Sequence, residues 1–202
     1  LSEFLPARDN RPRRASPRLH VPKRGKHAEI LHIAEANARQ DAERANPGID
    51  RERGISELHQ HLDLRFPPRR IEGFDISHLG GRDTVASLVV FEDGHPVKAD
   101  YRHFKIRSVE GRVDDFEAMR EVIARRYARV INDRLLRPDL VIVDGGVGQV
   151  SAAKGILDGL GLGDLPLAGL AKRKEEIYLP GRSAPTKLLD GSAALRLVQA
   201  VR

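Results

Sequence analysis

Two short apolar runs, each with an aspartate at or near its end, constrain the fold of this chain most. One run spans 71–76 and contains Asp75, and the other spans 140–143 and is followed directly by Asp144. Runs of this length are typical of buried strands, where an unpaired carboxylate costs several kcal/mol. A divalent cation cancels that cost, and oxygen ligands from neighbouring strands suit Mg²⁺ or Mn²⁺. We therefore predict that Asp75 and Asp144 share one metal ion.

The residues alone leave other interpretations of both aspartates open. Asp75 could be a surface aspartate at a strand end, since Asp is common in turns. Asp144 with Gly145 and Gly146 could form only a strand-to-helix turn. That geometric role is compatible with metal binding, because glycines also let a phosphate or a metal come close to the backbone.

The order of the predicted elements indicates an α/β fold, with a mixed sheet flanked by helices. Alternation and turn signals predict a three-strand antiparallel meander at 71–76, 84–91 and 96–106. Apolar residues at three- and four-residue steps predict a long amphipathic helix from Phe116 to Val130. The remaining pattern predicts a buried strand at 140–143, a helix at 148–160, strands at 166–170 and 176–179, and a last helix that begins at Ser192.

Composition divides the chain into three predicted parts. Residues 1–25 form a basic linker or arm, 26–66 a helical lead-in, and 67–202 the main domain. In the lead-in we expect a helix at 27–45 that is stopped at Asn46-Pro47-Gly48, and a short helix at 55–62. The first 26 residues carry eight Lys and Arg residues against Glu3 and Asp9, which indicates a polyanion partner such as nucleic acid; a solvated basic linker is the alternative.

Other features of the composition limit the chemistry. The chain has no cysteine, so any metal must bind oxygen and nitrogen ligands. No apolar stretch approaches the roughly 20 residues of a membrane helix. Lys172 and Arg173 follow a predicted central strand at the sheet end where substrates bind in such folds, which favours a phosphate contact. We interpret Arg125, Arg126 and Arg129 as the solvated face of the long helix, with phosphate contact as the alternative.

The amino-acid sequences of these segments resemble the endonuclease domain of UvrC, the family of bacterial nucleotide-excision-repair incision subunits. The segments that carry the resemblance are 71–78, 83–91, 101–106, 113–116, 119–122, 125–127, 138–146, 169–173 and 194–197, with 21–25 and 34–38 upstream. The resemblance covers nearly everything after residue 20 and keeps the family's order.

The resemblance implies an RNase H-like mixed five-stranded sheet and a metal-dependent endodeoxyribonuclease that makes the 5′ incision next to a DNA lesion. It implies Asp75 and Asp144 as catalytic residues and metal ligands, Asp115 as a third catalytic acidic position, and Mg²⁺ or Mn²⁺ as cofactor. The implied partners are damaged double-stranded DNA and, through parts of the parent protein that this chain does not include, the UvrB–DNA complex, with no membrane. The implied setting is cytoplasmic DNA repair and the SOS response.

Two points depart from or weaken this assignment. No histidine follows His103, so we expect the family's catalytic histidine beyond Arg202; an incomplete site is the alternative, and His78 is expected to orient a loop. A structural role for Asp115 is equally open. Asp114 and Glu117 have the spacing of a capping box, and the helix dipole would stabilise the charge of Asp115 in the first turn. A non-catalytic DNA-binding scaffold and a small-molecule phosphohydrolase remain as rival functions.

Overall fold

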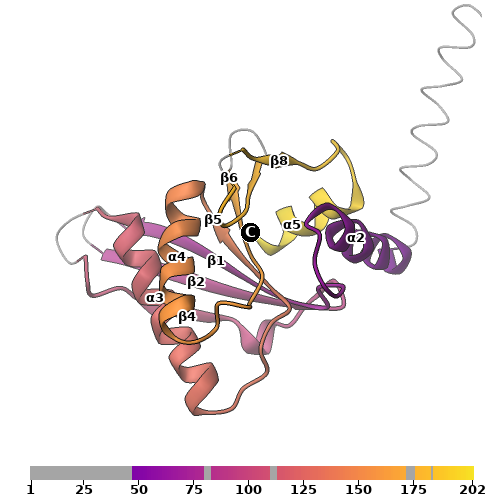
Figure 1. Ribbon diagram of the computed structural model, residues 1–202. Coiled ribbons are helices and arrows are strands. Elements are labelled where there is room, and N and C mark those ends of the chain that lie inside the picture. The colour runs from indigo at the N-terminus through magenta and orange to yellow at the C-terminus, as the bar shows by residue number, and fades with distance from the viewer. Residues whose placement is uncertain (1–46, 80–82, 110–112, 172–175, 183) are drawn as a thin grey trace, which may run out of the picture. The chain divides into compact units, whose positions relative to one another are not determined.

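The computed structural model describes residues 47–79, 83–109, 113–171, 176–182 and 184–202. They belong to a unit that spans 43–202. The basic arm and the expected helix at 27–45 lie outside the described residues, as do Lys172 and Arg173. The described elements (Figure 1) are α2 Pro47–His61, β1 Arg70–Leu79, β2 Asp83–Glu92, β3 His95–Pro96, the 3-10 turn η1 Lys98–Asp100, β4 Arg102–Lys105, α3 Asp115–Asn132, β5 Leu140–Asp144, α4 Val147–Gly159, β6 Leu167–Ala171, β7 Glu176–Tyr178, β8 Thr186–Lys187 and α5 Ala193–Val201.

The described strands form one mixed sheet in the order β3-β2-β1-β5-β6-β7-β8, with β4 also paired to β2. β2 pairs antiparallel with β1, whereas β1, β5 and β6 run parallel. The connections between the parallel strands contain α3 and α4, as parallel pairing requires. The expected mixed α/β fold is therefore confirmed. Five described strands have four or more residues, and three short strands of two or three residues bring the sheet to eight.

The third strand of the predicted meander is interrupted. β3 and β4 both pair with β2, but η1 lies between them. Pro96 has no N–H to continue the ladder, and the turn is closed by a bond from Asp100 N to Val97 O of 2.9 Å. Arg70 Nη2 donates to Asp100 Oδ2 at 2.7 Å and ties the turn to the start of β1.

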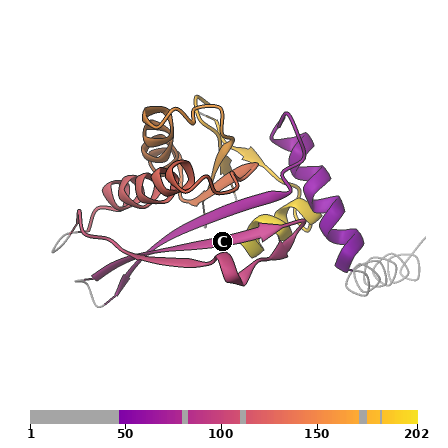
Figure 2. The same cartoon turned by 90° about the horizontal axis from the view of Figure 1, so that it is seen from below.

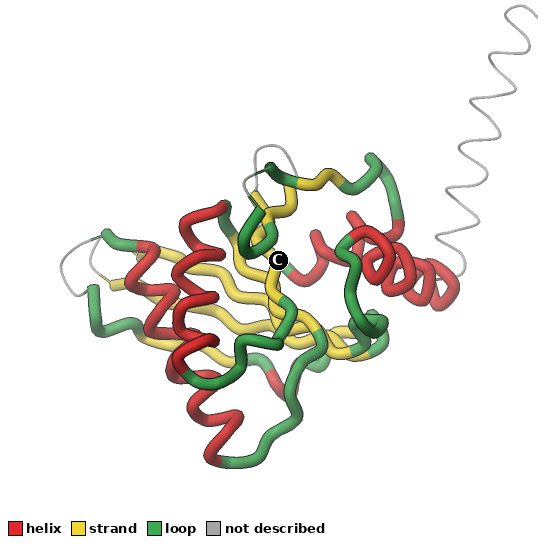
Figure 3. The backbone as a smooth tube through the Cα atoms, in the orientation of Figure 1, coloured by secondary structure: helices red, strands yellow, loops and turns green. Residues whose placement is uncertain are grey.

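Helices cover the sheet from two sides and create two cores. Phe74, Val141 and Val143 pack with α3 and α4, which lie side by side (Figure 3). Ile71 and Ile142, which alternate with those residues along the strands, pack with α2 and α5. β5 is thus apolar on both faces, as expected for a central parallel strand. Figure 2 shows α3 and α4 together on one side of the long strands.

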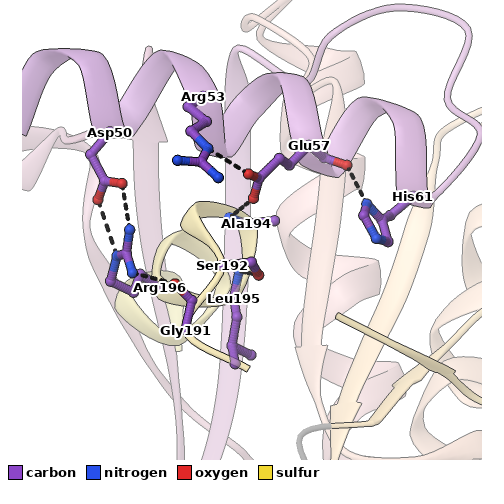
Figure 4. A network of polar contacts seen from close by, with 9 residues as sticks. All are labelled: Asp50, Arg53, Glu57, His61, Gly191, Ser192, Ala194, Leu195 and Arg196. Atoms are coloured by element: carbon purple, nitrogen blue, oxygen red, sulfur yellow. Dashed lines mark hydrogen bonds and ion pairs between the residues drawn. The ribbon is translucent and has the colours of Figure 1, made fainter. Parts of the chain in front are cut away.

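α2 is longer than predicted and belongs to the second core. We expected a short helix at 55–62 after a stop at Pro47 and Gly48, but the described helix runs from Pro47, and both residues lie within it. Tertiary contacts stabilise the added turns. In the added part, Arg196 of α5 donates to both oxygens of Asp50 at 2.6 and 3.1 Å; within the expected part, Ala194 N donates to Glu57 Oε2 at 3.0 Å (Figure 4).

A buried ion pair lies between β1 and α3. Arg126 donates to Glu72 at 2.5 and 3.1 Å, and Tyr127 Oη donates to Glu72 Oε2 at 3.1 Å. Burial and the Glu72 charge raise the pKa of Tyr127 well above its usual range, so the phenol keeps its proton and remains a donor. The expectation that Arg126 lies on a solvated face is wrong, because the buried Glu72 carboxylate requires a cationic partner.

Among the described residues, no helix has both the length and the apolar character that crossing a membrane requires.

Candidate nuclease site

Strand register places Asp75 and Asp144 at corresponding positions of two neighbouring strands. The parallel pair β1–β5 includes Gly73 with Ile142 and Phe74 with Val143, and the two aspartates are the next residue on each strand. Neighbouring strands are about 4.8 Å apart, and residues in register point to the same face. Both aspartates are half-buried. This juxtaposition is the one that a shared metal ion needs.

The face that carries both aspartates is the one covered further along by α5. Asp75 shares this face with Gly73 and Ile71, and a Cβ added to Gly73 would lie 2.5 Å from Val201 O of α5. Ser77, two residues further on the same face, donates from Oγ to Asp75 Oδ2 at 2.8 Å. A hydroxyl donor at this distance restricts the orientation of the carboxylate.

Glycines shape the backbone beside Asp144. Gly145 has φ of +149°, and a Cβ there would lie 2.6 Å from the Gln149 side chain. Its N–H donates to Leu170 O at 2.9 Å, and Gly169 of β6 has no Cβ that would otherwise meet Gly145 O at 2.6 Å. The Asp-Gly-Gly segment therefore makes the strand-to-helix turn that we considered, directly beside the predicted ligand.

The structure places Asp115 beside His78. Asp115 Oδ1 lies 2.7 Å from His78 Nε2, and His78 Nδ1 lies 2.9 Å from Thr84 Oγ1. His78 alternates with Asp75 along β1 and shares a face with Phe74, on the α3 side of the sheet. Asp114 caps α3 as expected, accepting from Glu117 N at 3.0 Å. The catalytic role of Asp115 stays a prediction.

The donor set at Asp75 and Asp144 fits a hard divalent cation. Two carboxylates from adjacent strands provide the oxygen ligands that Mg²⁺ and Mn²⁺ prefer. Within the described ranges, no group of three or more His, Asp and Glu residues is placed to hold a metal. An ion held by these two carboxylates would keep coordination positions for water and for phosphate oxygens, as is usual for Mg²⁺.

The strand register also places two polar residues that we did not predict as site residues on the same face as Asp75. Asp75 pairs with Ser87 of β2, and Ser87 pairs with His103 of β4. The polar alternation of the 96–106 run was the available signal, but the sequence does not give the register that aligns these residues with Asp75.

A cavity of about 480 Å³ lies between β4 and α3, and its lining includes Arg102, His103 and Phe104 of β4. It is also lined by Arg125 and Arg129, which pair with Glu121 at 2.8 Å and Asp133 at 2.9 Å. Arg126 also lines it and is held by Glu72. We assign the site to the aspartates rather than to this cavity, because these arginines already have carboxylate partners.

Comparison with known proteins identifies the family. A family model described as the UvrC RNase H endonuclease domain matches residues 59–202. UvrABC system protein C of Gloeobacter violaceus is 48% identical over 189 residues, which cover 91% of this chain and 30% of that protein. The Treponema denticola protein of the same name is 47% identical over 180 residues, which cover 87% of this chain and 27% of that protein.

The chain therefore spans less than a third of the length of these relatives. Among solved structures, human ENDOV aligns with a TM-score of 0.41 at 23% identity, covering 61% of this chain and 58% of that one. With a family model that covers most of the chain and relatives at this identity, the chain belongs to the UvrC family and contains its RNase H endonuclease domain.

Proposed function

We propose that this chain is a metal-dependent endodeoxyribonuclease domain that makes the 5′ incision beside a lesion in nucleotide excision repair. The observation that carries the proposal is the β1–β5 register, which brings Asp75 and Asp144 to adjacent positions on one face. Family membership supplies the reaction class, because the matching family model is described as an endonuclease domain.

In this proposal Asp75 and Asp144 bind one Mg²⁺ or Mn²⁺ ion. A cation bound there would polarise the scissile phosphate and lower the pKa of a bound water. The chain's own residues position that chemistry: Ser77 orients Asp75, and the turn at Gly145 and Gly146 fixes the backbone beside Asp144. Hydrolysis breaks the bond between phosphorus and the 3′ oxygen, so that the products carry a 3′-hydroxyl and a 5′-phosphate.

The proposed substrate is damaged double-stranded DNA held by UvrB. Relatives of this chain are named as component C of the UvrABC system, which supports a partner from the same system. Aromatic residues make up 4% of the chain, so base stacking contributes little. Phosphate charge and the deformability of the duplex at a lesion would decide binding more than base identity.

The test is incision of a lesion-bearing duplex by the full-length protein with UvrA and UvrB. Asp144→Asn and Asp75→Asn keep the side-chain shape but remove the charge, so we expect each to abolish the 5′ cut and leave the 3′ cut. Asp133→Asn, which removes an exposed carboxylate directly after α3, is the matched control and should leave both cuts.

Mn²⁺ titration calorimetry on the chain itself separates this function from the rival scaffold role. We expect wild type to bind the ion and both Asn variants to lose most of that affinity. Normal 5′ cutting by the Asp144→Asn variant would refute the assignment. DNA binding without any metal binding by the wild type would favour the non-catalytic scaffold instead.

A further inference from the structure

A row of polar side chains crosses the sheet at the proposed metal site. Asp144 on β5 and Asp75 on β1 are adjacent, Asp75 pairs with Ser87 on β2, and Ser87 pairs with His103 on β4. We call these four residues the polar row. Because paired residues point to the same face, the row is continuous across four neighbouring strands.

Among the described residues, the four of the polar row are partly or fully exposed on their shared face of the sheet. On β2 the residues of this face, Val85 and Ser87, are half-exposed, whereas Ala86 and Leu88, which point to the α3 side, are buried. α5 covers the same face only further along, where Val201 meets Gly73. A strand of nucleic acid therefore has access to this face beside Asp75.

Two basic-type side chains of β4 stand on this face. His103 is exposed, and its Nδ1 lies 3.2 Å from Ser87 Oγ, which restricts the ring orientation. Lys105 is exposed and pairs with Val85. It lies two residues after His103 and therefore points to the same face. Arg102 and Phe104 point to the other face, where Arg125 stacks on the Phe104 ring at 5.3 Å.

We infer that His103 and Lys105 bind backbone phosphates of the DNA strand, adjacent to the phosphate that Asp75 and Asp144 hold. β4 lies two strand spacings, or about 10 Å, from β1. These side chains would therefore reach phosphates on one side of the cut bond and within a few nucleotides of it. Exposed basic side chains suit this task, since phosphate contacts position the strand and carry no sequence information. The inference rests on the proposed function for the position of the cut.

The first test is the salt dependence of DNA binding by the whole chain, measured by fluorescence anisotropy with a fluorescein-labelled duplex that contains a short bubble. Each lost phosphate contact should reduce the slope of log affinity against log salt by about 0.7–0.9. We expect this loss for Lys105→Ala and recovery for Lys105→Arg. Arg102→Ala is the matched control on the same strand and should keep the wild-type slope.

The second test locates the contact. Neutral methylphosphonates are placed singly along the labelled strand, and affinity is compared between wild type, His103→Gln and Lys105→Ala. For each of the two side chains we expect one neutral position, a few nucleotides from the cut bond, that weakens binding by wild type and has no further effect on the variant lacking that side chain. Independent, additive losses at every position would overturn the inference.

The two proposals fail in different ways. If the full-length protein makes the 5′ cut but the Lys105 and His103 variants bind like wild type, the phosphate contacts are wrong and the function stands. If the coupling to methylphosphonates is found but Asp144→Asn still cuts normally, the catalytic assignment is wrong and the contacts stand.

Discussion

The direction of side chains along β1 decides which polar residues can act together. Asp75 and Ser77 point to the face of the polar row, whereas His78 points to the α3 side. Asp115 is hydrogen-bonded to His78. It therefore lies near the same end of β1 as Asp75, but on the opposite face of the sheet. Any effect of Asp115 on incision would then pass through His78 and the end of β1.

This geometry predicts different phenotypes for the acidic residues. Asp115→Asn and His78→Gln should retain Mn²⁺ affinity close to that of wild type, because neither side chain lies on the face of Asp75. Both should lower the free energy of unfolding by about 1 kcal/mol through the lost hydrogen bond. Calorimetric Mn²⁺ titration and urea unfolding measure the two effects. A large loss of Mn²⁺ affinity in Asp115→Asn would make Asp115 a metal ligand.

At the scale of elements, local patterns predicted most helices and strands. Asp114 and Ser192 cap α3 and α5, as their positions before apolar-periodic runs indicated. Tertiary contacts explain the exceptions. α2 extends to Pro47 through contacts with α5, and η1 interrupts the third strand because Asp100 is held by Arg70. Contacts between distant residues, and the register that aligns Ser87 and His103 with Asp75, are not encoded in a local pattern.

The contact between Glu57 of α2 and the start of α5 predicts that the stability of the fold depends on pH. Glu57 is partly buried, which raises its pKa, but hydrogen bonds from Ala194 N and Arg53 outweigh burial and leave the pKa below its ordinary value. A carboxylate with a depressed folded-state pKa stabilises the fold above its unfolded-state pKa. That contribution is lost as pH falls from near 4.5 toward the folded-state pKa.

We therefore expect Glu57→Gln to be less stable than wild type at pH 7, with the difference shrinking below about pH 4.5. Urea unfolding at a series of pH values measures it. Glu52→Gln, which removes an exposed carboxylate of the same helix, is the control. A difference that stays constant down to pH 3 would mean that Glu57 contributes through packing rather than through its charge.

For the whole molecule, the extent of the folded unit follows from the second core. Ile55, Leu58 and Leu62 are at most 5% exposed and pack with Ile142, Leu170 and Val198. We predicted a helical lead-in at 26–66 before the main domain, and that division stays a prediction; in the structure these three side chains of the lead-in share one core with β5, β6 and α5. The sequence could not show this, because a short amphipathic helix does not indicate which surface it covers.

Truncation tests this extent. A chain that begins at Pro47 keeps every described core residue, so we expect its free energy of unfolding to match that of the full chain. A chain that begins at Pro67 exposes the apolar surface under α2. Burial of each such side chain is worth about 1.5–3 kcal/mol, so three of them approach the roughly 5–15 kcal/mol that stabilises a whole domain. We expect this shorter chain to unfold or aggregate, as monitored by circular dichroism and urea titration. If it unfolded instead with the same midpoint and slope as the chain from Pro47, α2 would be an appendage of the domain, and the boundary would return to residue 67.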